Sequence, residues 1–284
     1  MAWWDIDPFW PLLIISQLSG FGVVGIMTYW IMEYKKGQFS WGKHDGGTIS
    51  YHAFMFTLGM VFLFGEAMLL FPVPKRLHLR SHFWRKVMHG CTQSMAIIFS
   101  IVGLKAIFLA KKEGGHHEFY SIHSWVGMAS AMLFFLQQGV AIFFYVFSKF
   151  FGLSKFFGPR FMIRFTSMHT FFGYVLFAMA IASCLTGMDR WIAIFVPDYS
   201  LRPTPTLLGD IYALMMMLYG VVVTYLTTRP PTLKKKKSTH HKKLANGDRG
   251  EEEKGLQPEK EDKQLNDNDH ELTPMKKGDA ENNI

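Results

Sequence analysis

The chain is poor in cysteine, because its 284 residues include only Cys91 and Cys184. The two cysteines lie in different long apolar stretches, at opposite ends of the expected membrane layer, so they cannot pair in a disulfide bond. The sequence has no C-x-x-C-H string, which excludes covalent haem attachment. The N-terminus lacks the basic lead and the small-residue cleavage site of a signal peptide, so we expect the first apolar stretch to be retained.

Charge is nearly missing from six long stretches, although 18% of the whole chain is charged. Each stretch holds 21 to 25 residues, and a helix needs about 20 to cross a hydrocarbon layer of ~30 Å. A soluble protein would show shorter helices with charge on one face. The sequence therefore predicts an all-α membrane protein with six transmembrane helices, at Pro11–Met32, Tyr51–Phe71, Val87–Ala110, His123–Phe147, Phe165–Gly187 and Leu207–Thr227.

The six spans define a transmembrane domain at residues 11–228, after a short N-terminal segment at 1–10. The composition changes from Arg229 onward. Pro230 and Pro231 end the last helix, and four lysines follow at 234–237. The remainder of the segment 229–284 has almost no apolar residues, which is typical of a disordered tail.

Lysine and arginine are unevenly divided between the connections. The loops between spans two and three and between spans four and five, with the segment just after span six, carry 14 of them. The remaining connections carry seven. The positive-inside rule therefore places the more basic loops and both termini in the cytosol.

Four histidines lie within otherwise apolar spans: His52, His89, His123 and His169. An ionisable side chain at membrane depth indicates a functional site. Spans two and four begin outside the cytosol, so His52 and His123 are expected at one depth, with His89 and His169 roughly 15–20 Å away along the membrane normal. Two imidazoles facing each other across a helix bundle can ligate one iron, so the pattern predicts two bis-histidine haems b and electron transfer. The alternative is a buried imidazole that is hydrogen-bonded to a backbone carbonyl.

Small residues accompany the histidines. Gly59, Gly127 and Gly173 share the histidine faces of their helices and could make room for a flat cofactor, or could serve ordinary helix packing. The positions 14 residues after each histidine are also small or polar: Glu66, Gly103, Gln137 and Ser183. Glu66 is expected to face the deeper histidine layer, where it could hydrogen-bond a haem group or relay a proton.

Several strings resemble the cytochrome b561 family: Y-S-I-H-S-W at 120–125, G-E-A at 65–67 and V-M-H-G at 87–90, together with the placement of the four histidines. The likeness covers roughly residues 10 to 230. It implies that the four inner helices hold two haems b, with His52 and His123 on the non-cytosolic haem and His89 and His169 on the cytosolic one. It also implies a homodimer that takes electrons from cytosolic ascorbate and passes them to monodehydroascorbate or ferric iron. The expected location is a vesicle, lysosomal or plasma membrane.

The resemblance also indicates a donor site. The family has basic residues seven and three positions before the span-three histidine and seven before the span-five histidine, where this chain has His82, Lys86 and Met162. Lys86 matches, and Arg85, Arg160 and Arg164 lie close enough to replace the missing cations. The alternative is that these charges serve orientation alone. Because the dense cations near a histidine pair lie here, we expect an anionic reductant to enter from the cytosol and the acceptor to be reduced near His116, His117 and Tyr120.

Two other functions remain open from the sequence. One is a di-haem membrane subunit that exchanges electrons with quinone in a larger complex. The other is a haem-free, histidine-rich transporter. A role in binding nucleic acid is not expected, and the lipid bilayer is the expected environment.

Overall fold

The computed structural model describes residues 8–35, 39–43, 46–77, 81–115, 117, 119–152, 155–201 and 203–229. Within these residues every regular element is a helix, and six helical segments are long and apolar enough to cross a membrane. This confirms the predicted all-α fold with six spans. The predicted tail lies beyond the described residues, apart from Arg229, and its disorder stays a prediction. The six segments are Phe9–Tyr34, Thr48–Lys75, His82–Glu113, Ile122–Phe147, Pro159–Phe195 and Thr204–Thr228.

Four of the spans are single helices, and two are interrupted by π-helical segments. The single helices are α1 (Phe9–Tyr34), α5 (His82–Glu113), α8 (Pro159–Phe195) and α9 (Thr204–Thr228). The second span consists of α2 (Thr48–Phe56), the π-helix η2 (Thr57–Leu63), α3 (Phe64–Leu69) and α4 (Pro72–Arg76). The fourth consists of α6 (Ile122–Ile142), the π-helix η3 (Phe143–Phe147) and α7 (Ser148–Phe150), and a 3₁₀ turn η5 (Tyr199–Leu201) precedes α9.

Local sequence sets where the helices start. The Ser81 hydroxyl accepts a hydrogen bond from the Trp84 amide at 3.3 Å and so caps α5. Ser121 caps α6 in the same way, and Pro159 occupies the first turn of α8. Helices α5 and α8 extend beyond the predicted spans, because hydropathy marks only residues in the hydrocarbon, whereas the backbone hydrogen bonds continue to the cap.

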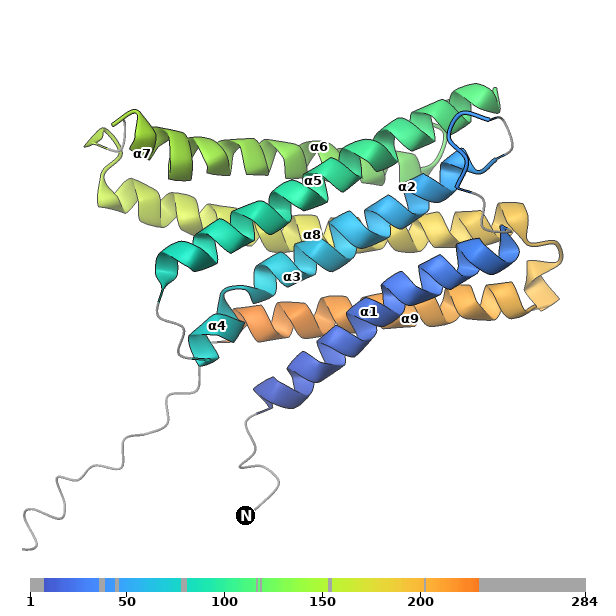
Figure 1. Cartoon of the computed structure of the whole chain (residues 1–284), viewed down its shortest axis with the longest axis horizontal. Coiled ribbons are helices and arrows are strands. Elements are labelled where there is room, and N and C mark those ends of the chain that lie inside the picture. Colours follow the sequence, from blue (N-terminus) through green and yellow to red (C-terminus); the bar gives the residue numbers. More distant parts are fainter. Residues whose placement is uncertain are drawn as a thin grey trace, which may run out of the picture. The chain divides into compact units, whose positions relative to one another are not determined.

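The helices pack as antiparallel neighbours: α2 on α5, α6 on α8, and α1 on α9. The α2–α3 segment, α5, α6 and α8 form the inner bundle, and α9 contacts both α3 and α8. Figure 1 shows α1 and α9 together along one side of these four helices. The result is an inner four-helix bundle with two flanking helices.

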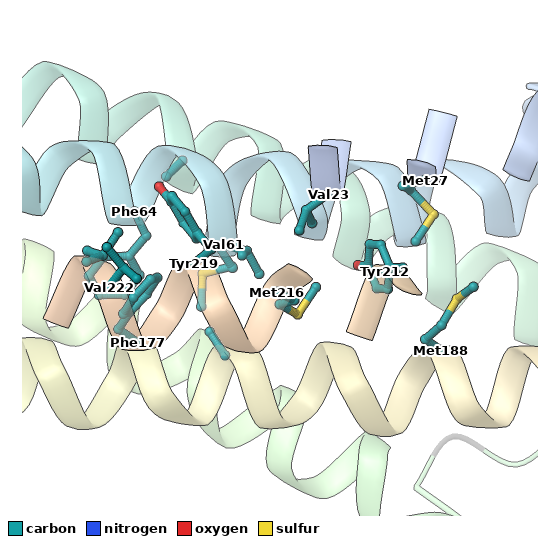
Figure 2. Close-up of a cluster of buried hydrophobic side chains, with 14 of the residues drawn as sticks. Val23, Met27, Val61, Phe64, Phe177, Met188, Tyr212, Met216, Tyr219 and Val222 are labelled. Carbon is teal, nitrogen blue, oxygen red and sulfur yellow. The ribbon is translucent and has the colours of Figure 1, made fainter. Parts of the chain in front are cut away.

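The buried core lies where α1 and α9 meet the inner helices. Figure 2 shows side chains of α1, α9, the second span and α8 in this cluster, including Met27, Phe64, Phe177 and Met216. Trp30 is 1% exposed, and its indole nitrogen donates to the Pro205 carbonyl at 3.1 Å. Many large apolar side chains elsewhere are exposed in the isolated chain, as expected for a surface that contacts lipid.

Candidate redox site

The structure brings the four intramembrane histidines together as two pairs. The ring centres of His52 in α2 and His123 in α6 lie 5.9 Å apart. The ring centres of His89 in α5 and His169 in α8 lie 6.3 Å apart. Because α2 and α6 begin where α5 and α8 end, the pairs lie toward opposite ends of the bundle (Figure 1). We call these the His52 end and the His89 end.

Each pair has room for one metal ion between its rings. Two imidazoles on one metal, each with a bond of about 2 Å, have ring centres roughly 6 Å apart. Among the described residues no group of three or more His, Cys, Asp or Glu side chains could hold a metal. A haem iron needs only two protein ligands, since the porphyrin supplies the other four. The histidine pairs therefore fit a haem and do not fit a tetrahedral metal site.

Backbone carbonyls orient the rings at the His52 end. The Nδ1 atom of His52 lies 3.1 Å from the Gly103 carbonyl, and that of His123 lies 2.9 Å from the Ser183 carbonyl. A carbonyl oxygen only accepts, so each Nδ1 carries the proton and each Nε2 keeps a lone pair for a metal. A histidine that is hydrogen-bonded to a backbone carbonyl, which is the alternative to ligation in the sequence, is thus compatible with ligation.

The His89 end repeats part of this arrangement. The Nδ1 atom of His89 lies 2.8 Å from the Ala67 carbonyl, and the His89 ring centre is 5.0 Å from that of Phe71. The His169 ring lies edge-on to Tyr145, with ring centres 6.1 Å apart. Aromatic neighbours therefore flank both imidazoles at this end.

The positions 14 residues after the histidines include two of these partners. Gly103 follows His89 by 14 residues and holds the ring of His52 from the antiparallel neighbour. Ser183 follows His169 by the same interval and holds His123. Antiparallel pairing of α2 with α5 and of α6 with α8 brings these distant positions together. In each of these two helix pairs, one helix thus carries a candidate ligand and the other carries the carbonyl that orients it.

A cavity opens beside the His52 pair. Its lining includes both histidines, Gly127 and Ser183. A β-carbon at Gly187 would lie 2.7 Å from Cε1 of His123, so glycine is needed there for the ring to fit. The cavity and its glycines provide space next to the two imidazoles.

The three glycines that share the histidine faces serve different purposes. Gly127 lines the cavity, which agrees with room for a cofactor. A β-carbon at Gly59 would lie 3.0 Å from the Ala96 carbonyl of α5, so Gly59 serves helix packing. A β-carbon at Gly173 would meet only Gln137, at 3.5 Å, which is ordinary contact.

Two of the predicted donor-site residues lie beside the His89 pair. Lys86 is exposed, and its Nζ lies 5.5 Å from the ring centre of Tyr145, which contacts His169. Arg85 is half-buried and donates from Nη1 to the Phe71 carbonyl at 3.5 Å. The other three predicted donor-site residues are exposed, one in the first turn of α5 and two near the start of α8: His82, Arg160 and Arg164. Tyr145 was not singled out by the sequence, because nothing local marks its position beside Lys86 and His169.

Basic residues also gather at the His52 end, although the sequence predicts dense cations only at the other end. The guanidinium of Arg190 lies 4.7 Å from the ring centre of Tyr120, and the Lys111 Nζ lies 5.4 Å from it. All three residues line the cavity of the His52 pair. In the sequence Lys111 and Arg190 follow two separate spans, and only the tertiary structure brings them together.

Two donors at this end are buried without a hydrogen-bond partner in the described part of the chain: Nε of Arg190 and Nε1 of Trp191. Both residues line the cavity, and buried donors without a partner are uncommon in folded proteins. Of the predicted acceptor-site residues, Tyr120 lines the cavity and His117 is exposed in the connection before α6. His116 lies outside the described residues.

The chain is similar in sequence to known membrane proteins. The family described as eukaryotic cytochrome b561 matches residues 51–194, which contain all four histidines. The chain is 30% identical over 207 residues to the transmembrane ascorbate-dependent reductase CYB561 of Ovis aries, covering 72% of this chain and 76% of the relative. It is 29% identical over 209 residues to the Mus musculus protein of the same name, covering 72% and 78%. It is also 29% identical over 211 residues to the lysosomal membrane ascorbate-dependent ferrireductase CYB561A3 of Rattus norvegicus, covering 71% and 75%.

Proposed function

The chain belongs to the cytochrome b561 family, and we propose that it carries single electrons across a membrane from cytosolic ascorbate to an acceptor on the other side. Membership makes it an oxidoreductase with multiple membrane spans. The names of its relatives, which include ascorbate-dependent reductases and a ferrireductase, support the choice of donor.

The two histidine pairs carry the proposal. Each pair would hold one non-covalent haem b, His52 with His123 and His89 with His169, and the ring separations of 5.9 and 6.3 Å support this assignment. When bound, a haem with two imidazole ligands supplies a one-electron couple and keeps no position open for oxygen. The carbonyls of Gly103, Ala67 and Ser183 would hold the imidazoles in the tautomer that ligation needs.

Basic side chains would bind ascorbate at the His89 end. Ascorbate is an anion at neutral pH, and Lys86 places positive charge over the ring of Tyr145 while Arg85 places it at the Phe71 carbonyl. Lys86 is exposed and can reach a ligand from solvent, whereas Arg85 is held by a backbone carbonyl. His82, Arg160 and Arg164 would add to the positive potential at the same end.

The acceptor would bind at the His52 end, where Arg190, Lys111 and Tyr120 are among the residues that line the cavity. Two cations favour an acceptor with negative charge, either monodehydroascorbate or ferric iron in an anionic complex, and they repel a bare ferric cation. His117, exposed on the connecting segment, could add a further contact.

Haem content and electron transfer test this proposal directly. The purified protein should contain two haems b per chain by pyridine haemochrome assay, and ascorbate should reduce them. One haem per chain would contradict the assignment of the two pairs. Rapid reduction by a quinol together with no reduction by ascorbate would instead favour the quinone-linked alternative.

A further inference from the structure

Glu66 is an acidic side chain inside the second span, and the proposed function does not use it. Its Oε1 accepts a hydrogen bond from Gln17 in α1 at 2.9 Å and from the hydroxyl of Tyr219 in α9 at 3.1 Å. The sequence position of Glu66 predicts that it faces the deeper histidine layer, whereas these bonds direct its carboxylate to the two flanking helices. A carboxylate at membrane depth is costly and indicates a function.

The chain makes room for this contact. The Tyr219 ring is fully buried, and a β-carbon at Gly65 would collide with its ring and hydroxyl. A β-carbon at Gly20 of α1 would lie 2.8 Å from Cε2 of the same ring. Figure 2 shows Tyr219 extending from α9 toward the second span. Glycines on two helices thus admit one tyrosine to the carboxylate.

The backbone next to Glu66 is also unusual. The Tyr219 hydroxyl lies 2.9 Å from the Phe62 carbonyl, within the π-helix η2 that directly precedes α3. Single π-helical turns inside α-helices recur at functional sites. The carboxylate, the tyrosine and the π-helical turn therefore form one connected polar group inside the membrane.

This group is connected to the His89 pair through one residue. Ala67 follows Glu66 directly, and its carbonyl orients the His89 ring at 2.8 Å. A charge is screened less inside a protein than in water, so an added electron at the His89 pair and the charge of Glu66 repel each other. The hydrogen-bond partners of Glu66 are neutral and do not cancel its charge.

We propose that Glu66 takes up one proton when an electron reaches the centre at His89 and His169, and releases that proton when the electron leaves. The proton adds to a carboxylate oxygen and forms the carboxylic acid, and it comes from and returns to the aqueous phase. One electron and one proton arrive together, no other bond changes, and the net charge of the region stays constant. This inference rests on the proposed function, because it requires a redox centre at the His89 pair.

In the described part of the chain, the titratable groups that contact Glu66 or its neighbours can be separated by mutation. Helix α1 contributes the neutral amide of Gln17, α9 contributes Tyr219, and α5 contributes His89 through the Ala67 carbonyl. Arg85 of α5 lies at the same end and bonds the Phe71 carbonyl. Glu66 is the carboxylic acid in this group, so changing it alone addresses the proposal.

The test is a potentiometric titration of the purified di-haem protein over a range of pH. The potential of the centre at the His89 end should fall as pH rises, by up to about 59 mV for each tenfold change in proton activity in a one-electron couple. Glu66→Gln should abolish this slope, and Glu66→Asp should keep it. The matched control is Glu113→Gln, which removes a carboxylate that contacts Thr48 at the His52 end and should leave the slope unchanged.

Infrared spectroscopy provides a second readout that does not depend on activity. The reduced-minus-oxidised difference spectrum should show a protonated-carboxyl band that Glu66→Gln removes. A wild-type potential that is independent of pH, or a slope that persists in Glu66→Gln, would overturn the inference. Because electrochemical titration needs no ascorbate, a failure of ascorbate to reduce the protein would contradict only the proposed function.

Discussion

At the scale of single residues, the hydrogen bonds of the histidines decide how they can act. His52, His89 and His123 each place Nδ1 against a backbone carbonyl, which leaves Nε2 available as a ligand atom. His169 is defined by its ring neighbours, His89 and Tyr145. A substitution at one histidine should therefore affect its own pair and spare the other.

His123→Ala should remove one haem and leave the haem of His89 and His169 spectrally intact, because the pairs lie on different helix ends. The measurement is the haem-to-protein ratio together with the reduced absorption spectrum. Loss of both haems from protein that keeps its helical circular dichroism would argue against independent pairs.

Lys86→Ala should slow reduction by ascorbate at subsaturating concentration and leave the haem spectrum unchanged. Because Lys86 is exposed, its contribution should be about 1 kcal/mol or less, a slowing of up to roughly fivefold that weakens further at high salt. Lys75→Ala is the matched control, since Lys75 is an exposed lysine of α4 at the same end. Equal slowing in both variants would mean that only the overall charge matters.

Arg190→Gln should weaken the reduction of an anionic acceptor at the His52 end. Arg190 is half-buried in the cavity lining, so the loss of a charge-assisted contact should be about 1.5–3 kcal/mol, roughly tenfold or more in acceptor kcat/KM. Stopped-flow oxidation of the reduced protein by a ferric chelate measures it. Lys112→Gln, which changes an exposed neighbour of Lys111, should have little effect, and equal losses in the two variants would exclude a specific Arg190 contact.

At the scale of the helices, close packing depends on which glycines face a neighbour. Gly65 and Gly20 admit the Tyr219 ring between α1, α3 and α9, and Gly59 lets the second span approach α5. Gly25 of α1 meets nothing within 4 Å. Glycines in these helices therefore differ in how much they contribute to packing, according to whether they face a neighbouring helix.

Gly65→Ala should destabilise the protein by about 1–3 kcal/mol, because the new methyl group overlaps Tyr219 in a filled interior. Gly25→Ala should be neutral or slightly stabilising, since alanine forms helix better and nothing obstructs it. Unfolding in detergent mixtures, followed by circular dichroism, compares the two. Equal stability of both variants would show that α3 and α9 can separate without cost.

At the scale of the whole molecule, the arrangement of the pairs at opposite ends suits transfer from one side of a membrane to the other. Basic residues flank both ends: Lys86 and Arg85 near His89, and Lys111 and Arg190 near His52. Charge near the sites therefore does not by itself decide the direction of transfer. The cytosolic assignment of the His89 end follows from the basic loops and stays a prediction, as does the homodimer.

In sealed vesicles of known orientation, ascorbate on the side of the His89 end should reduce an impermeant acceptor on the other side. His52→Ala or His123→Ala should abolish that transfer and still allow ascorbate to reduce the centre at the His89 end. The measurement is acceptor reduction inside vesicles loaded before ascorbate is added. No transmembrane transfer in a preparation with both haems bound would defeat the proposed function.

The sequence by itself determined the six spans and the class of the fold, because long uncharged stretches have few alternatives to membrane helices. It also indicated which histidines share a depth, since span direction alternates along the chain. Both properties follow from the composition of each stretch and from the order of the stretches along the chain, and neither requires knowledge of contacts between helices. The limits of α5 and α8 were underestimated, because a helix continues past the hydrocarbon until a cap or proline ends it.

Only the tertiary structure decided which side chains meet across helices. It brought Lys111 and Arg190 to one cavity, placed Tyr145 near both Lys86 and His169, and directed Glu66 toward Gln17 and Tyr219. The sequence does not determine the rotation of a nearly uniform apolar helix about its axis, because nearly every face is equally hydrophobic. Contacts among small and polar residues set that rotation, and these contacts form only when the helices pack.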